Sequence, residues 1–263
     1  MKFPPSPVVP FRHHQRLTDT AGVVARADGI MPRHGDGYRV DDAARGLAVT
    51  CRESSPSAEL ITLGRRYLHF LAQAQAADGK FRGQLGGDRR WRGRAEARDA
   101  WGRSLRALGT AAARGPAAGI REQARARFDA SAVAGSPYPH SMAFAALGAA
   151  EVTGRRPGHP GALSLLAIVG TVIGEPAADA GWPWPAARLS YANAAIAEAV
   201  IVAGHELGRG HLLRDGRARV QTAQATGQRP GSWRWLPVMH PAAEARTGGA
   251  RMSHPRPVVR FQV

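Results

Sequence analysis

The chain has 263 residues, enough for one large domain or two small ones. Hydrophobic residues make up 44% and charged residues 21%, proportions that argue against a collagen, a coiled coil or wholesale disorder. The formal net charge is +16; the segment 217–263 contributes +7 of it and the rest of the chain +9. The charge is therefore partly a property of the tail. Nucleic-acid binding through this tail is the least favoured function, because no zinc-ligand spacing or helix-turn-helix pattern accompanies the charge.

The cellular setting is inferred from the cysteine count and from the apolar runs. Cys51 is the single cysteine, so a disulfide scaffold is excluded and a reducing compartment is the default. The longest apolar stretch, 162–174, is too short to span a bilayer. The first residues lack the apolar core of a secretory signal. We therefore expect a soluble, cytoplasmic protein without a membrane span.

The N-terminal part of the chain shows little periodic pattern. Residues 1–10 are a proline-rich lead that we expect to be disordered, and the polar, glycine-punctuated segment 11–38 is predicted to be an ordered loop. A first helix is predicted over 41–51, because Asp41 and Asp42 at its start suit a helix N-terminus.

The rest of the chain to about residue 221 is typical of helices separated by loops. In 57–76, apolar residues recur at intervals of three and four positions, which predicts a helix. Asp78-Gly79 follows as its end signal. The segment 80–98 is rich in glycine and arginine and is predicted to be a loop. Further helices are predicted over about 99–113, 117–133, 140–152, 161–173, 189–207 and 211–221, with breaks at glycine and proline between them. No segment shows convincing period-2 alternation, so the fold class is predicted to be all-α.

Pairing consecutive helices gives four helical hairpins. The helices that open them start near residues 41, 99, 140 and 189, a spacing of about 40 to 60 residues that is typical of helix-pair repeats with variable loops. Chemically versatile side chains gather at these starts, namely Tyr38, Asp41, Asp42, Asp99, Trp101, Arg103, Tyr138, His140, Trp182, Trp184, Arg188, Tyr191 and Asn193. If the four opening helices line an inner ring, these side chains converge at one mouth of that ring.

The segment 217–263 breaks this pattern. Five prolines interrupt it, and it has no apolar period of 3.6 residues. The sequence therefore predicts three regions: the lead 1–10, a helical domain over 11–216, and a basic, irregular tail over 217–263.

Four strings in the same order resemble a bacterial six-hairpin glycosidase-like family. They are HQRLTDTAG (14–22), GYRVDDAARGL (37–47), AWGR (100–103) with Leu108-Gly109, and WPWP (182–185) with RLSYANA (188–194). The resemblance covers about 11–216. It implies an (α/α) toroid of helical hairpins with a glycan bound at its mouth. Because the family's domain also occurs beside or fused with glycosyltransferases, it further implies a glycosyltransferase as one candidate partner.

The chain departs from the family pattern at three places. Ala43 stands where the family usually has asparagine, and Thr20 stands where it has a second acid. The closing hairpins of the toroid, with their Asp-Gln-Gln-Pro-like motif, have no counterpart in the tail. The resemblance therefore implies an incomplete toroid of about the four hairpins counted above.

Three carboxylates are the candidates for catalysis. Glycoside hydrolysis needs two carboxyl groups across the scissile bond. Asp41 and Asp42 point in different directions at a helix start, so one could face the mouth; Asp99 could supply the second group, and Glu198 is better explained by a salt bridge. The alternative is that all three aspartates serve only as helix caps and complement the helix dipole.

Aromatic and polar side chains at the same helix starts form the predicted substrate-binding set. Aromatic faces suit the CH groups of a sugar ring, although packing between hairpins is an equal alternative for Trp101. Arginine and asparagine suit hydroxyl groups or a phosphate, although an arginine near a helix start is more often solvated or salt-bridged. The set is Tyr38, Trp101, Arg103, Trp182, Trp184, Arg188, Tyr191 and Asn193.

Other chemistries lack their motifs. The ten histidines show no metal-ligand spacing, so no metal site is predicted. No GxxxxGK[ST], strand-borne GxGxxG or GxSxG motif is present, so we predict no cofactor and no nucleophilic triad. The sequence thus predicts a domain that binds or processes a glycan by acid/base chemistry. The alternative is a non-catalytic accessory module beside a glycosyltransferase.

Overall fold

The computed structural model describes residues 11–174, 182–184, 189 and 191–227, with side chains to residue 225. The chain divides into two units, Met1–Ala225 and Thr226–Val263. The predictions for the lead 1–10, for Arg188 and for the tail from residue 228 lie outside the described residues.

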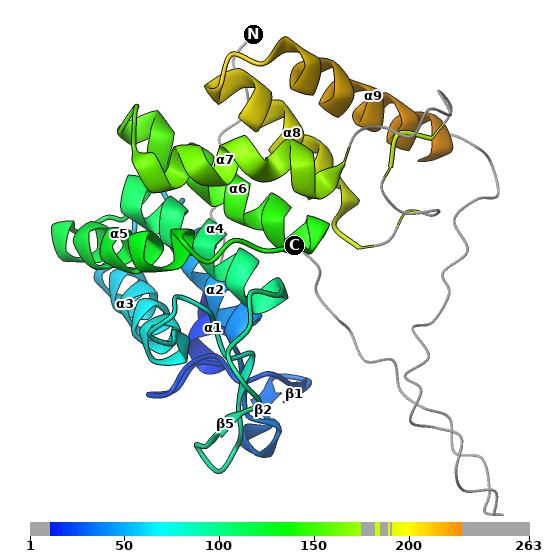
Figure 1. The fold of residues 1–263 in the computed structure, drawn as a ribbon. Helices are drawn as coiled ribbons and strands as arrows, with labels where there is room; N and C mark the ends of the chain where they lie inside the picture. Colours follow the sequence, from blue (N-terminus) through cyan, green and yellow to red (C-terminus); the bar gives the residue numbers. More distant parts are fainter. Residues whose placement is uncertain (1–10, 175–181, 185–188, 190, 228–263) are drawn as a thin grey trace, which may run out of the picture. The chain divides into compact units, whose positions relative to one another are not determined.

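Within the described residues, the chain is predominantly helical, which confirms the predicted all-α class (Figure 1). The described helices are α1 (Arg12–Arg16), α2 (Val40–Thr50), α3 (Ala58–Ala74), α4 (Asp99–Arg114), α5 (Ala118–Ala132), α6 (Pro139–Arg155), α7 (Pro160–Ile173), α8 (Asn193–Glu206) and α9 (Gly210–Gly227). Helix α1 lies in the segment 11–38, which was predicted to be a loop; the other helices start and end within a few residues of their predicted bounds, except at α8 and α9. Helix α9 continues past Gly216, into the segment predicted to be irregular.

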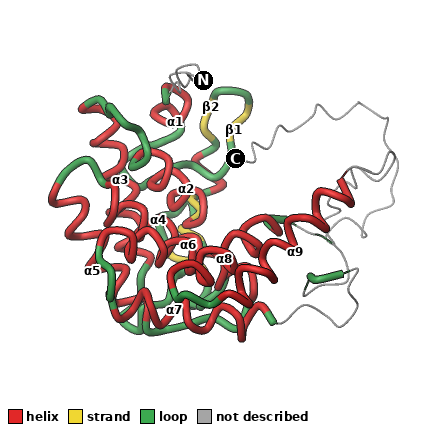
Figure 2. The backbone as a smooth tube through the Cα atoms, turned by 90° about the horizontal axis from the view of Figure 1, so that it is seen from above, coloured by secondary structure: helices red, strands yellow, loops and turns green. Residues whose placement is uncertain are grey.

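The helices of the first unit form an inner and an outer row. In the inner row, α2 packs on α4, α4 on α6, and α6 on α8. In the outer row, α3, α5 and α7 each pack against the preceding inner helix (Figure 2). Each inner helix therefore pairs with the outer helix that follows it in the chain, which is the predicted hairpin repeat.

The fourth hairpin is formed by α8 and α9. Gly204 of α8 faces Leu213 of α9, and Gly216 of α9 faces Ile201 of α8. The earlier residue of α8, Ile201, meets the later residue of α9, and the later residue of α8, Gly204, meets the earlier one. The two helices are therefore antiparallel. The four predicted hairpins are thus present in the described residues.

Helix α3 illustrates how the sequence selects an outer helix. Ser57 caps it by accepting a hydrogen bond from the Leu60 amide at 3.3 Å. Leu60, Leu63, Tyr67 and Leu71 recur at helical spacing and are all buried. The opposite positions are largely polar and exposed, so one apolar stripe fixes which face of α3 packs on the core.

Inner helices α4 and α6 approach each other closely because glycines line their contact. A Cβ atom at Gly102 would meet the Ser141 backbone, and one at Gly109 would meet the Gly148 backbone. One at Gly148 would in turn meet the backbone of Leu105. The close approach keeps the N-terminal turns of α4 and α6 adjacent.

Two segments predicted to be loops contain short strands. Strands β1 (Ala27–Asp28) and β2 (Met31–Pro32) form a hairpin, and β3 (Tyr38–Arg39), β4 (Gln84–Leu85) and β5 (Trp91–Arg92) form an antiparallel sheet. In the register of that sheet, Leu85 pairs with both Tyr38 and Trp91. Strands of two residues are too short for a period-2 pattern, so the sequence could not predict them. Because β3 runs directly into α2, the sheet fixes where α2 begins.

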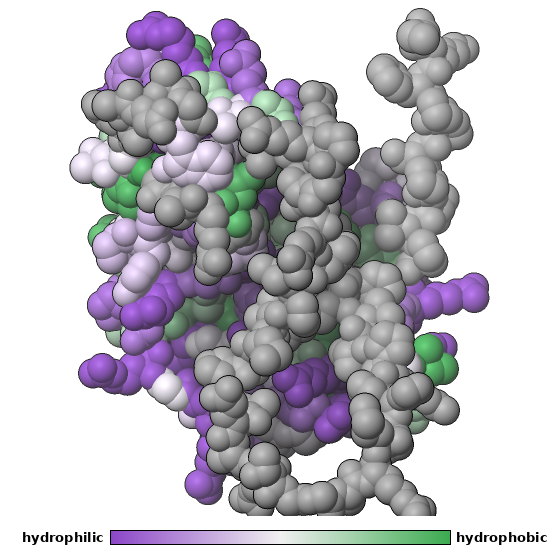
Figure 3. Space-filling model, turned by 90° about the vertical axis from the view of Figure 1, so that its right-hand side faces the viewer, coloured by the Kyte–Doolittle hydropathy of each residue, from purple (hydrophilic) through white to green (hydrophobic). Residues whose placement is uncertain are grey.

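The described surface carries few large apolar side chains. On the face in Figure 3, hydrophilic residues predominate among the coloured atoms, with small hydrophobic groups between them. The large apolar side chains that are exposed are Ile30, Met31, Val133, Tyr138, Ile168, Tyr191 and Val220. Among the described helices, none combines the length and the apolar character that crossing a membrane requires.

Candidate functional site

The N-terminal ends of the inner helices α4, α6 and α8 are joined by side-chain contacts. The Tyr191 hydroxyl, just before α8, donates a hydrogen bond of 2.8 Å to Oδ1 of Asp99 at the start of α4. The His140 ring, at the start of α6, stacks on Tyr191 with ring centroids 4.8 Å apart, and its Nε2 lies 3.3 Å from Oδ1 of Asn193. We call Asp99, Arg103, His140, Tyr191 and Asn193 the helix-end cluster.

Asp99 is the anionic centre of this cluster. Its Oδ1 accepts from Tyr191, and its Oδ2 accepts from Nε of Arg103 at 3.1 Å. Burial and the hydrogen bond to Asp99 raise the pKa of Tyr191 to about 12. The phenol therefore stays protonated at neutral pH and serves as a donor.

Helix α2 contributes Asp41 and Asp42, which share the guanidinium of Arg45. Asp41 accepts from Arg45 at 3.1 Å and from Arg39 at 3.3 Å, and Asp42 accepts from Arg45 at 3.0 Å. Burial and the adjacent charge of Asp41 raise the pKa of Asp42. The N-cap position of α2 is Arg39, so neither aspartate is the N-cap residue. The negative charge of Asp41 also acts on the Tyr191 phenol, which places α2 beside the helix-end cluster.

A pocket of about 200 Å³ opens at this end of the inner row. Asp41 and Asp99, two of the three predicted catalytic carboxylates, both line it. The remaining lining residues are Arg39, Phe81, Gly83, Arg94, Glu96, Arg98 and Ala100. The pocket thus combines carboxylates and guanidinium groups, which bind hydroxyl groups or anionic groups of a ligand.

Tyr38 does not belong to the helix-end cluster, contrary to its predicted role in sugar stacking. It is 1% exposed, and its hydroxyl donates a hydrogen bond of 2.6 Å to Asp19. The Arg89 guanidinium lies 4.7 Å from the ring centroid. Burial and the Asp19 carboxylate raise the pKa of Tyr38 to about 12. The hydrogen bond between Tyr38 and Asp19 joins strand β3 to the loop that carries Asp19. The tyrosine ring has no face open to a ligand.

Two predicted stacking tryptophans are also core residues. Trp101 is fully buried, and its indole Nε1 donates to the Ser131 carbonyl at 3.3 Å, joining α4 to the end of α5. Trp184 is 5% exposed. In this structure the burial of both side chains leaves no ring face open to a sugar. Trp182 is half-buried and packs against the core.

Of the predicted substrate-binding residues, the structure brings Arg103, Tyr191 and Asn193 together. Sequence reasoning noted His140 at a helix start but did not select it, because a lone histidine has no diagnostic spacing. Asn193 carries a buried Nδ2 that finds no acceptor among the described residues. Between Tyr191 and Asn193, Ala192 has a left-handed backbone with φ of 55°. This conformation costs an alanine roughly 1–2 kcal/mol, and such strain is concentrated at functional sites.

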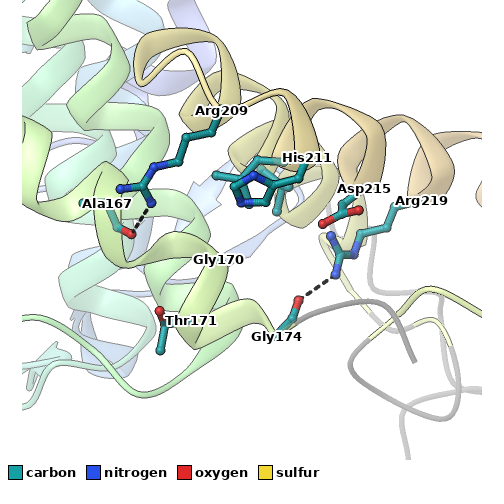
Figure 4. A pocket seen from close by; sticks show the side chains of 10 residues that line it. Ala167, Gly170, Thr171, Gly174, Arg209, His211, Asp215 and Arg219 are labelled. Atoms are coloured by element: carbon teal, nitrogen blue, oxygen red, sulfur yellow. Dashed lines mark hydrogen bonds between the residues drawn. The ribbon is translucent and has the colours of Figure 1, made fainter. Parts of the chain in front are cut away.

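A second pocket, of about 370 Å³, lies between α7, α8 and α9 (Figure 4). Arg209, His211 and Asp215 line it, and Arg219 forms part of its wall. Arg219 is 1% exposed and donates to the Gly174 carbonyl at 2.9 Å and to the Pro183 carbonyl at 2.8 Å. Its guanidinium thus joins α9 to the end of α7 and to the loop before α8. Among the described residues, none of the predicted site residues lines this pocket.

The histidine, cysteine and acidic side chains of the described residues form no group of three or more that could hold a metal ion. The helix-end cluster offers the carboxylate of Asp99, the imidazole of His140, the phenol of Tyr191 and the guanidinium of Arg103. These groups can bind a polyhydroxylated ligand and move protons to or from it.

Comparisons with known proteins bear on the fold. No family model matches the chain, and no curated protein matches it in sequence. Among solved structures, the chain is similar to a sugar epimerase from a ruminal bacterium, with a TM-score of 0.60 and 11% identity. The match covers 83% of this chain and 68% of the epimerase chain. At this identity, the likeness shows that the two proteins share a helical fold.

Proposed function

We propose that this chain is a carbohydrate-active protein that binds a sugar at the helix-end cluster and its pocket. The observation that carries the proposal is the contact of Asp99 with Tyr191, and of Tyr191 with His140, because it unites the starts of three inner helices. The resemblance to six-hairpin glycosidase-like proteins and the fold shared with a sugar epimerase support a sugar as ligand. The pocket is smaller than the roughly 300–1,000 Å³ of drug-sized ligand sites, so it suits a single sugar ring.

For catalysis we propose acid/base chemistry with Asp42 and Asp99. A general acid works best with a raised pKa, and Asp42 is the predicted carboxyl whose pKa is raised by burial. Asp99 accepts hydrogen bonds from two donors, Arg103 and Tyr191, which hold its carboxylate in one orientation. Asp42 would therefore donate a proton to the glycosidic oxygen as its bond to the anomeric carbon breaks. The Asp99 carboxylate would accept a proton from the water that forms the new bond to that carbon.

The placement of His140 favours epimerisation as a second candidate reaction. Inverting the sugar carbon next to the carbonyl of the open-chain form requires a base that removes its proton, which leaves an enolate, and an acid that returns a proton to the opposite face. His140 can do either, because its ring nitrogens donate or accept according to the tautomer. It lies against Tyr191 and Asn193, which would hold the ring in one orientation.

Incubation of the protein in deuterated water with mono- and disaccharides tests the proposal. Glycosidic cleavage releases new reducing ends. Epimerisation produces the epimer and places deuterium on the inverted carbon. A non-catalytic module beside a glycosyltransferase binds sugar without either change. If no sugar binds or reacts, the proposed function is wrong.

Matched variants assign the reaction to the cluster. Asp42→Asn should abolish glycosidic cleavage, and His140→Gln should abolish deuterium incorporation. Asp28→Asn is the control, because Asp28 is an exposed carboxylate on the β1–β2 hairpin, away from the inner helices. Unchanged turnover in Asp42→Asn and His140→Gln would contradict the assignment to these residues.

A further inference from the structure

Arg106 is a half-buried cation beside the helix-end cluster that the proposed chemistry does not use. It lies three residues after Arg103 on α4, so both side chains project from the same face of that helix. Their guanidinium carbons lie 4.2 Å (Arg103) and 5.8 Å (Arg106) from the ring centroid of Phe144 on α6. Two cations thus share one aromatic ring.

The two arginines differ in how their charge is compensated. Arg103 is paired with Asp99 at 3.1 Å. Among the described residues, no oxygen accepts a hydrogen bond from Arg106 and no carboxylate forms an ion pair with it. Burial lowers the pKa of Arg106, and the nearby charges of Arg52 and Arg103 lower it further.

The carboxylates that face Arg106 do not satisfy its donors. Glu151 on α6 attracts it, but the two oxygens of Glu151 already accept from Arg52 at 3.0 Å and from Arg114 at 2.7 Å. Glu198 on α8 also attracts it, from beyond ion-pair distance. The guanidinium of Arg106 thus keeps donors available at a partly desolvated position, where a charge-assisted hydrogen bond is strongest.

We propose that Arg106, together with Arg103, binds the anionic group of an acidic sugar, a carboxylate or a phosphate. The inference rests on the proposed function, because it names the substrate class of the same site. Guanidinium groups match both oxyanions with paired hydrogen bonds. A neutral sugar offers Arg106 only uncharged hydroxyl acceptors, which form weaker hydrogen bonds with a guanidinium than an oxyanion does.

Calorimetric titration with D-glucuronate, D-glucose 6-phosphate, D-glucose and inorganic phosphate tests this proposal. At least one of the two acidic sugars should bind about tenfold or more tightly than D-glucose, the scale of one charge-assisted hydrogen bond. Comparison of the two acidic sugars identifies the carboxylate or the phosphate as the preferred group. Arg106→Gln should remove this preference and leave D-glucose binding unchanged. The control is Arg65→Gln, which removes the same charge from an exposed position on outer helix α3.

The outcomes separate this inference from the proposed function. If D-glucose binds as tightly as both acidic sugars, or if Arg106→Gln and Arg65→Gln behave alike, the assignment of Arg106 is wrong and the sugar site stands. If inorganic phosphate binds in an Arg106-dependent manner but no sugar does, the anion site stands and the sugar function is wrong. If none of the four probes binds, both are wrong.

Discussion

The hydroxyl of Tyr191 donates a 2.8 Å hydrogen bond to Oδ1 of Asp99, although the two residues are 92 positions apart in the chain. This bond joins the start of α8 to the start of α4 across the N-terminal end of α6. His140 of α6 stacks on the same tyrosine, so a single phenol contacts two neighbouring helices. The helix-end cluster depends on this one side chain more than on any other.

Replacing Tyr191 with phenylalanine tests its part in ligand binding. Tyr191 is 46% exposed, so Tyr191→Phe should change the free energy of unfolding by less than about 1 kcal/mol. The loss of a donor to Asp99 should weaken sugar binding about tenfold, measured by calorimetry. The matched control is Tyr138→Phe, because the Tyr138 hydroxyl bonds to no described residue. Equal sugar affinity in both variants would show that the Tyr191 hydroxyl has no part in binding.

Adding one methyl group where α4 meets α6 tests the glycine contact. In Gly109→Ala, the new Cβ would meet the backbone of Gly148, so the two helices must separate. We expect a loss of about 1–3 kcal/mol in the free energy of unfolding, measured by urea denaturation. Gly119→Ala on α5 is the control, because its Cβ meets nothing within 4 Å and should add up to about 1 kcal/mol of stability. Equal stability of the two variants would refute the close packing.

The raised pKa of Asp42 predicts a pH-dependent stability. Because burial raises the pKa, the folded protein binds this proton more tightly than the unfolded chain does. The ionised carboxylate therefore costs folding free energy above its folded-state pKa and costs none in acid. Asp42→Asn, which carries no charge at any pH, should be more stable than the natural protein at about pH 7, and the difference should close near about pH 3. A difference that is the same at both pH values would contradict the burial effect.

Arg219 is expected to contribute to stability. Arg219→Ala removes the hydrogen bonds to the carbonyls of Gly174 and Pro183 and leaves a cavity in the wall of the second pocket. The loss should be about 2–4 kcal/mol, and thermal denaturation measures it. Arg217→Ala on the exposed side of the same helix should change stability by less than about 0.5 kcal/mol. If the two variants melt at the same temperature, Arg219 does not join α9 to α7.

Helical periodicity was enough to predict the hairpins and the neighbourhood of the site. The apolar stripe of α3 and the breaks at glycine and proline located the helices to within a few residues in most cases. The repeat then implied that the starts of the opening helices lie together. The hydrogen bond from Tyr191 to Asp99 and the contact of His140 with Asn193 agree with that expectation.

The roles of individual aromatic side chains could not be predicted, because they depend on distant partners. The indole of the buried Trp101 donates a hydrogen bond to the carbonyl of Ser131, 30 residues later in the chain. Tyr38 is held by Asp19, in a loop without periodic pattern. His140 and Asn193 are 53 residues apart in the chain, and they become neighbours only when α6 and α8 pack together. A local pattern carries no information on such pairings.

Mapping sugar binding onto backbone amides tests whether a sugar binds at the helix-end cluster. The protein labelled with ¹⁵N would be titrated with D-glucose, D-glucuronate and D-glucose 6-phosphate while amide chemical shifts are recorded. We predict that at least one sugar shifts the amides of Asp99, His140 and Asn193 and leaves those of Arg209 and Asp215, at the second pocket, unchanged. Shifts confined to α9, or no shifts with any of the three sugars, would contradict a sugar site at the helix-end cluster.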